Sequence, residues 1–223
     1  MSTPRLPGQP EYPGQPAAWP DVSPWKKLSQ SFGTFGKPRL RREALTLLID
    51  VSALPGTGWR ELNTSSSRVG AGAGSRESIA KRARATGEFS AVRRFRTEQP
   101  KPGRGVMVQV LPMASVADAQ AQVQMMPSSI VRWSGVETLE DRVLDDIEVP
   151  LTDSLLAWER LNERKGYGKG YSRTIAANVG RRVLLVSCSG MGAGCEWSEV
   201  VLIASAQARR LAEPKASDEA IEN

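Results

Sequence analysis

The chain has 223 residues, of which 40% are hydrophobic and 24% charged, and its formal net charge is +6 at pH 7. It contains no histidine, which excludes Ser-His-Asp and Cys-His hydrolytic centres and the common histidine-bound zinc sites. The length suits one large domain or two small ones, with enough apolar residues for a packed core.

Residues 1–40 are predicted to form a flexible, basic tail rich in proline and glycine. The motif PGQP at 7–10 is repeated at 13–16, a spacing that favours extended polyproline conformations over a packed core. The chain shows no secretory leader, no lipid-attachment cysteine and no run of about 20 apolar residues that would cross a bilayer. We therefore expect a cytoplasmic protein, and the basic tail leaves peripheral membrane association open.

A single α+β domain is predicted over residues 41–212, with a disordered C-terminus at 213–223. Its first expected elements are a short helix, a turn closed by Leu54-Pro55-Gly56, a strand and an arginine-rich helix that follows Ser75. These four elements are placed at 42–49, 54–58, 59–63 and 76–86.

A hairpin is the next expected element, with strands at 89–97 and 105–111. Val106, Val108 and Val110 alternate with other residues, the period of two of a half-buried strand. Ser115 and Asp118 resemble a capping box that opens a helix, and Pro127 is predicted to end it.

The second half is predicted to add more antiparallel strands and a closing helix. Trp197, Val201 and Ala208 belong to an apolar stripe that predicts this last helix. The expected fold is therefore α+β, a curved and mostly antiparallel sheet with helices packed on it. The strands of this half are placed at 143–148, 155–161, 171–178 and 182–188.

One motif resembles a known group of proteins. Leu54-Pro55-Gly56-Thr57-Gly58-Trp59 is similar to the "DLPxGW" entry of actinobacterial extracytoplasmic lipoproteins and kinase sensor domains, and Ala206-Gln207-Ala208 is similar to their alanine-rich helices. The resemblance covers residues 41–212 in outline and implies a PsbP-like α+β sandwich that binds a ligand or partner. Ser52-Ala53 stands where those proteins have an acid before the leucine.

Three glycines, Gly190, Gly192 and Gly194, lie between the last predicted strand and the last helix, as a dinucleotide phosphate loop would. The G-x-G-x-x-G spacing of that loop is not met, because the third glycine comes one position early. We keep the three glycines as candidate ligand-binding residues, since backbone amides at a helix start can hold a small anion.

Cys188 and Cys195 flank the same loop. Two reduced, partly buried thiols are the expectation for a cytoplasmic protein, and a disulfide that pins strand to helix is the alternative. The pair is too poor in ligands for a zinc site, so no metal and no cofactor is predicted.

A second candidate ligand-binding loop alternates basic residues, glycines and tyrosines. It contains Lys165, Tyr167, Lys169 and Tyr171. It is neither a P-loop, because glycine follows Lys169, nor a Tyr-x-x-x-Lys pair. Basic and aromatic side chains in alternation can contact phosphates and stack on bases, whereas a plain hairpin tip is the alternative.

We hypothesise a non-enzymatic binding or sensor-like module with an unknown protein or small-ligand partner and an unassigned oligomeric state. The alternative is electrostatic binding of nucleic acid or another polyanion through two basic segments. An enzyme that uses lysine, tyrosine or carboxylate chemistry remains a third class. The polyanion-binding candidates are Lys37, Arg39, Arg41, Arg42, Arg82, Arg84, Arg93, Arg94 and Arg96.

Overall fold

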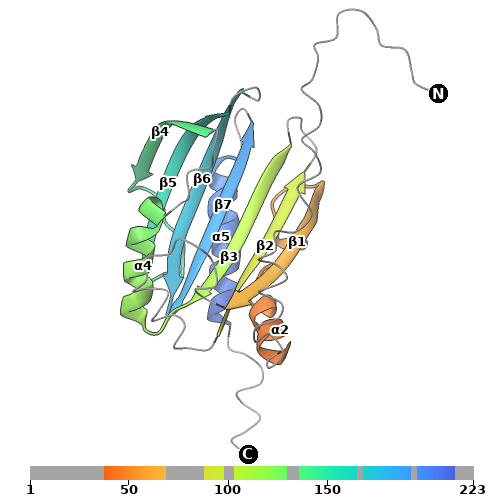
Figure 1. Cartoon of the computed structure of the whole chain (residues 1–223), viewed down its shortest axis with the longest axis vertical. Helices are drawn as coiled ribbons and strands as arrows, with labels where there is room; N and C mark the ends of the chain where they lie inside the picture. The colour runs from red at the N-terminus through yellow and green to blue at the C-terminus, as the bar shows by residue number, and fades with distance from the viewer. Residues whose placement is uncertain are drawn as a thin grey trace, which may run out of the picture. The chain divides into compact units, whose positions relative to one another are not determined.

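The computed structural model describes residues 38–68, 88–97, 103–129, 136–164, 168–191 and 195–213. Within these residues, seven strands form one antiparallel sheet with three α-helices packed against it (Figure 1). The predicted α+β fold with a curved antiparallel sheet is confirmed. The elements are α2 (Pro38–Thr46), the 3-10 helix η1 (Val51–Ala53), β1 (Trp59–Arg68), β2 (Phe89–Thr97), β3 (Arg104–Pro112), α4 (Val116–Ser129), β4 (Val136–Leu144), β5 (Ser154–Arg164), β6 (Gly168–Val179), β7 (Arg182–Met191) and α5 (Trp197–Ala212).

The strand order is β1-β2-β3-β7-β6-β5-β4, so the sheet consists of two meanders that meet at its centre. Helix α4 carries the chain from β3 to β4 at the far edge, and the chain then returns strand by strand to β7. The seam between β3 and β7 is antiparallel, with Val108 opposite Val186. Both of these valines are fully buried, as expected for strands that are covered on both faces.

One face of the sheet packs against α5 and α2. Val106, Val108 and Val110 of β3 point to this face and contact the apolar stripe of α5, which includes Ile203 and Ala204. The alternating apolar side chains of β3 and the apolar stripe of α5 therefore pack into one core. A shift of β3 by one residue would turn its valines away from this core, so the packing fixes the register of β3.

The opposite face packs against α4 over part of its area. Ala119, Val123 and Met126 of the helix lie against Trp158 of β5 and Leu185 of β7. Helices α4 and α5 thus cover opposite faces of the sheet (Figure 1).

Several element boundaries differ from those predicted. The strand expected at 143–148 is β4 at Val136–Leu144, and the helix expected at 42–49 is α2 at Pro38–Thr46. β4 lies at the edge of the sheet, where its side chains need not be apolar, and its Val143 is half exposed. Its sequence therefore has no apolar run from which the strand could be predicted. Helix α4 ends at Ser129, two residues later than the predicted end at Pro127.

The helix predicted at 76–86 lies outside the described residues. The same holds for most of the predicted tail at 1–40 and for nearly all of 213–223, so the predicted domain boundaries stay predictions.

Candidate binding face of the sheet

Arginines on the α5 face are held by carboxylates. Arg104 donates from Nη1 to both carboxylate oxygens of Glu199, at 3.0 and 2.8 Å, and its guanidinium lies 5.3 Å from the ring centroid of Trp59. Arg173 donates from Nε to Glu159 at 2.6 Å. These side chains are largely buried, and each charge is paired with an opposite charge. The ion pairs therefore belong to the contact between α5 and the sheet and are not available to a ligand.

Arginines on the α4 face have a different environment. Successive residues of a strand point to opposite faces, so Arg94 and Arg96 of β2 lie on the face opposite that of Arg93. Arg94 and Arg96 are exposed, and Arg94 donates to the neutral amide oxygen of Asn63 at 3.2 Å. Among the described residues, neither arginine forms an ion pair with a carboxylate.

A third arginine joins them from the neighbouring strand. Arg60 of β1 lies directly opposite Arg96 in the β1–β2 ladder and is also exposed. Side chains directly opposite in an antiparallel pair have Cβ atoms about 5 Å apart, and like charges in that position destabilise the pair. The fold thus places three arginines at this edge of the α4 face.

Gly105 continues the same row of side-chain positions towards the centre of the sheet. It lies opposite Arg96 on one side and Ser189 on the other. A Cβ built on Gly105 would meet its nearest atom, Ser189 Oγ, at 3.7 Å, which is an ordinary van der Waals contact. Neither backbone strain nor crowding by the described residues therefore requires glycine here, although glycine inside a strand costs about 0.5–1 kcal/mol relative to alanine.

Small hydroxyl residues complete the row. Ser189 is opposite Ser172 of β6, and Ser189 is exposed whereas Ser172 is half-buried. Helix α4 packs on the other end of this face, against residues that include Ala176 and Val183. We use the name polar shelf for six positions of this face that lie outside the footprint of α4, which are Arg60, Arg94, Arg96, Gly105, Ser172 and Ser189.

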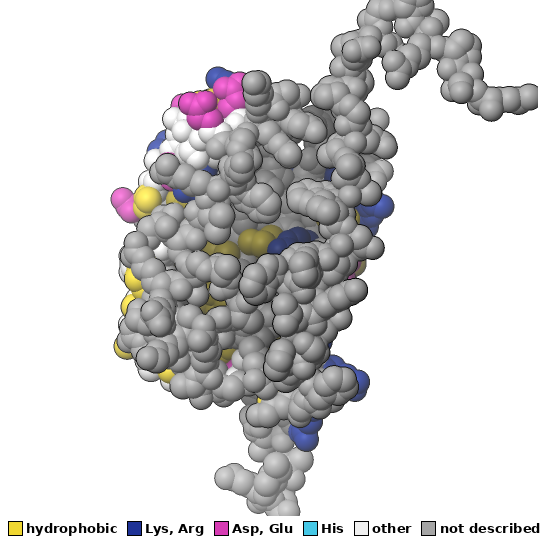
Figure 2. All heavy atoms as spheres, in the orientation of Figure 1, with side chains coloured by type: hydrophobic (Ala, Val, Ile, Leu, Met, Phe, Trp, Pro, Cys, Tyr) yellow, Lys and Arg dark blue, Asp and Glu magenta, His cyan; other side chains and the backbone are white. Residues whose placement is uncertain are grey.

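Charge is distributed unevenly between the two edges of the sheet. Asp and Glu side chains gather at the β4–β5 end, and Lys and Arg side chains lie along the β1 and α2 side (Figure 2). In the row of the shelf, the position after Ser172 is Arg160, which donates to Asp141 of β4 at 2.6 Å. The positive end of the row is therefore the end formed by β1 and β2.

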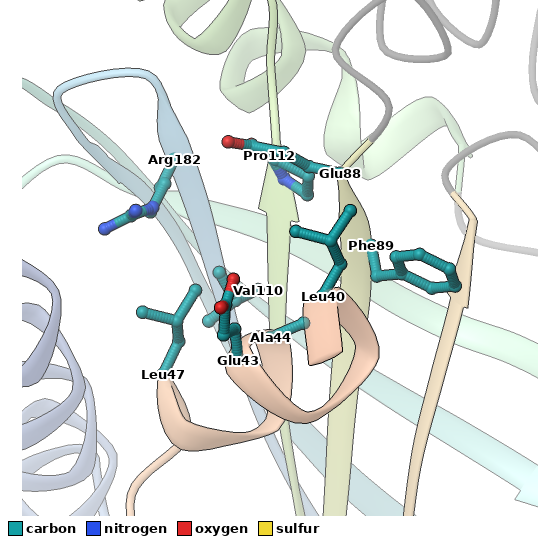
Figure 3. A pocket seen from close by; sticks show the side chains of 9 residues that line it. All are labelled: Leu40, Glu43, Ala44, Leu47, Glu88, Phe89, Val110, Pro112 and Arg182. Carbon is teal, nitrogen blue, oxygen red and sulfur yellow. The ribbon is translucent and has the colours of Figure 1, made fainter. Parts of the chain in front are cut away.

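A cavity of about 60 Å³ lies between α2 and the sheet (Figure 3). Its walls are mostly apolar, and Glu43 at its edge is bonded to Arg39 at 2.8 Å. A space of this size holds a few water molecules or a short aliphatic group, so it is too small for most ligands. The lining residues are Leu40, Glu43, Ala44, Leu47, Glu88, Phe89, Val110, Pro112 and Arg182.

The predicted ligand-binding residues are only partly within the described chain. Tyr171 is directly opposite Gly190 in the β6–β7 ladder, so two of them lie side by side on the α5 face, and Lys169 is exposed on β6. Nothing in the described residues tests whether these positions bind a ligand, and they stay predictions. Gly192, Gly194, Lys165 and Tyr167 lie outside the described residues.

The predicted polyanion-binding residues do not share one surface. Arg93 points to the α5 face, where it bonds to Asp50 and to the carbonyl oxygen of Ile49 and is largely buried. Arg41 of α2 bonds to Ser66 Oγ at 2.9 Å. Arg39 and Arg42 are exposed on α2, whereas Lys37, Arg82 and Arg84 lie outside the described residues.

Four residues of the shelf were missed by sequence reasoning. Arg60, Gly105, Ser172 and Ser189 carry no motif, and only the strand register brings them into one row. The available signal was Gly105, an isolated glycine in a predicted strand, which marks a bulge or a close approach by a ligand.

The two cysteines form a disulfide between β7 and the start of α5, with Cα atoms 6.0 Å apart. The expectation of two reduced thiols is therefore wrong, and the alternative is the observed state. Both residues are buried, and the carbonyl oxygen of Cys195 accepts a hydrogen bond from Arg173.

Two further classes of site were sought within the described residues. Their acidic and sulfur side chains form no group of three or more that would hold a metal ion. None of their helices is both long and apolar enough to cross a membrane.

Among known proteins, the chain is similar to solved structures but not to any family model or curated sequence. The extracellular domain of PknH from Mycobacterium tuberculosis is similar with a TM-score of 0.46 and 12% identity, over 76% of this chain and 96% of that one. A putative uncharacterized protein from Mycobacterium smegmatis, the Rv0999 ortholog, is similar with a TM-score of 0.41 and 9% identity, over 71% and 91%.

The predicted cytoplasmic location is contradicted. The finding on this chain that overturns it is the Cys188–Cys195 disulfide, because such bonds persist in oxidising compartments and are rare in the cytosol.

Proposed function

We propose that the protein is a non-enzymatic binding module whose ligand or partner rests on the polar shelf. The observation that carries this proposal is Gly105. A glycine at the second position of the inner strand β3 lowers strand stability, and neither its backbone nor its described neighbours require it. The absence of a side chain keeps the row open between Arg96 and Ser189, where a ligand can approach the backbone.

The shelf also has the composition of a recognition surface. Arg94 and Arg96 offer charged donors, and Ser172 and Ser189 offer hydroxyl groups that can donate or accept. All of them stand on strands of a paired sheet, so their spacing is set by the ladder. Such an arrangement supports binding by preformed contacts.

We further propose that the protein works outside the cytoplasm. The support is the disulfide, which closes the connection between β7 and α5 and is buried. In a reducing compartment the disulfide would be open, and only the surrounding packing would hold the connection between β7 and α5 in place.

Nuclear magnetic resonance of the isotope-labelled protein tests the binding face. Mixtures of small polar metabolites are added, and the amide shifts are followed. We expect perturbed amides at Gly105, Ser172 and Ser189, and we expect Gly105→Val to abolish these shifts while its melting temperature stays equal or rises. The rise follows from replacing glycine by a β-branched residue in a strand.

Ser65→Val is the matched control. Ser65 lies on β1 opposite Val92, on the same face but outside the shelf, and is exposed. The control should keep the ligand-induced shifts. Ser172→Val serves as a second blocking variant. Ligand-induced shifts that persist in both blocking variants would place the binding site elsewhere and refute the proposal.

A further inference from the structure

We infer that Leu151 of one copy of this chain inserts into the cavity between α2 and the sheet of a second copy, and that two copies exchange this contact in a symmetric dimer. The contact lies at the opposite end of β3 from Gly105, so it goes beyond the proposed function and does not depend on the polar shelf. Its basis is an exposed leucine in a strained turn and an apolar cavity of matching size.

Leu151 lies in the connection between β4 and β5 and combines two features that cost stability. Its φ is 67°, the single positive value among the described residues other than glycine, and a leucine adopts that conformation with strain. Its side chain is apolar but 58% exposed. Hydrogen bonds hold the turn in place: Thr152 Oγ1 donates to the carbonyl oxygen of Val149 at 2.8 Å. The amide of Asp153 donates to the carbonyl oxygen of Asn178 of β6 at 2.9 Å. A fixed turn that presents a strained apolar side chain to solvent indicates a contact with a partner.

The cavity between α2 and the sheet fits this side chain. Its volume of about 60 Å³ corresponds to about four or five water-sized groups, and a leucine side chain has four carbon atoms. Ala44, Leu47 and Val110 are among its walls, so the inserted carbons would meet apolar surface (Figure 3). Leu40 and Leu47 are only half-buried, which leaves the cavity open beside α2. Burial of the leucine in this space removes apolar surface from water and stabilises the dimer.

The charges around the leucine and around the cavity are complementary. Three exposed acids precede Leu151 in the same connection, without a basic residue among them. The two carboxylates of the cavity wall are bonded to Arg39 and Arg181, whereas Arg182 of the wall forms no ion pair with a described carboxylate. The acids can therefore approach Arg182 of the second copy, but an anionic membrane surface would repel them, which argues against insertion of the leucine into lipid. The three acids are Asp145, Asp146 and Glu148.

The leucine and the cavity lie at the same end of the sheet. Successive partners across this end are Ser154 of β5, Asn178 of β6, Val183 of β7 and Leu111 of β3. Leu151 precedes the first of these strands, and the cavity lies against the last. Three strand spacings, about 14 Å in total, therefore separate these two strands. A twofold axis between the two sites brings the leucine of each copy to the cavity of the other, so one closed interface contains both contacts.

Sedimentation velocity of the full chain over a range of concentrations tests the dimer. We expect a reversible equilibrium between monomer and dimer. Leu151→Asp should weaken the dimer about tenfold or more, because an ionised carboxylate is disfavoured in an apolar cavity. Leu202→Asp is the matched control, since Leu202 lies on α5 and is also 58% exposed. The control should change the dissociation constant less than about twofold.

The cavity is tested from its own side. Ala44→Leu fills it and should also weaken the dimer about tenfold or more. Arg182→Glu reverses a charge at the same cavity and carries this test if Ala44→Leu does not fold. A mixture of Leu151→Asp with either cavity variant should form a heterodimer that is tighter than the homodimer of each variant, because one of the two contacts is intact.

Three outcomes would overturn the inference. The first is a chain that stays monomeric at every concentration. The second is equal weakening by Leu151→Asp and Leu202→Asp, which would indicate diffuse apolar association. The third is a dimer that the cavity variants leave unchanged, or a mixture that forms no heterodimer, since Leu151 would then contact a different surface.

Discussion

Gln207 connects two parts of the chain that are about 160 residues apart in sequence. Its side chain, on α5, is fully buried and bonds to the backbone that follows α2. Nε2 donates to the carbonyl oxygen of Leu47 at 2.7 Å, and Oε1 accepts from the amide of Ile49 at 3.1 Å. One buried amide thus satisfies two backbone groups of the segment that follows α2.

Replacing Gln207 with methionine keeps the volume and removes both hydrogen bonds. We expect the free energy of unfolding to fall by about 2–4 kcal/mol, because two buried backbone groups lose their partners. Urea denaturation measures the loss. Gln124→Met makes the same chemical change at an exposed position of α4 and should stay within about 0.5 kcal/mol of wild type. A similar, small change in both variants would show that Gln207 does not anchor α2.

Residue-level reasoning from sequence found part of the candidate site. Arg93, Arg94 and Arg96 were selected together because their charges cluster in the chain. The alternation of β2 sends Arg93 to the opposite face, where its partners come from the segment after α2. Pairing partners that are distant in sequence decide which arginine is neutralised, so charge pattern alone could not separate structural arginines from exposed ones.

At the scale of elements, the start of α5 is fixed by several independent contacts. The side chains of Glu196 and Glu199 form a capping box, and Glu199 also accepts from Arg104 of β3. The disulfide adds a covalent link from β7 to the residue before Glu196. The helix is therefore tied to two neighbouring strands at the seam between the meanders.

The disulfide is predicted to stabilise the protein and to resist reduction while the chain is folded. Cys188 and Cys195 are both almost fully buried, so reductant reaches them only when the region opens. The closed loop has a sequence separation of 7 residues, and the chain-entropy model assigns such a loop about 2–3 kcal/mol. Replacing both cysteines with alanine should lower the free energy of unfolding by about that amount.

Intact-mass spectrometry under non-reducing conditions measures the state of the bond. The purified protein should be lighter than the sequence mass by two hydrogens. Mild reductant should leave the folded protein unmodified by iodoacetamide and expose both thiols in denaturant. Two alkylatable thiols in the folded, unreduced protein would contradict the prediction.

Elements with a strong period were predicted well, and elements without one were not. β2 was placed at its observed bounds, and the valines of β3 point to one core as expected. β4 was placed too late because three of its nine residues are acidic and its described side chains are mostly exposed. Pairing with β5 makes it a strand, including the ion pair of Asp141 with Arg160, and such tertiary support leaves no local signal.

At the scale of the whole sheet, the two meanders share one seam. β3 pairs with β7 along nine residue pairs, and α5 packs on β6 and β7 across one face. Strand order could not be read from sequence, because the crossover through α4 joins β3 to the far edge rather than to its neighbour. The shelf depends on this order, since Gly105 and Ser189 become neighbours only through the seam.

We predict that the two meanders of the sheet unfold as one cooperative unit. Val108 is fully buried at the seam, and Val108→Ala should cost about 2 kcal/mol through lost burial and a small cavity. Because both meanders need the seam, we expect the backbone amides of β2 and β5 to be protected from hydrogen exchange by the same free energy in the wild type. The variant should lower the protection of both strands by the same free energy.

Ser67→Ala on β1, at an exposed position far from the seam, serves as the control and should leave the protection of β5 unchanged. If Val108→Ala reduced protection in β2 but not in β5, the two meanders would be separate folding units. The row that joins Arg96 to Ser172 would then be interrupted whenever one meander opened, and a ligand that spans it would stabilise both meanders together. The same exchange experiment, with and without a metabolite that perturbs the amides of both Gly105 and Ser172, therefore measures whether the shelf works as one surface.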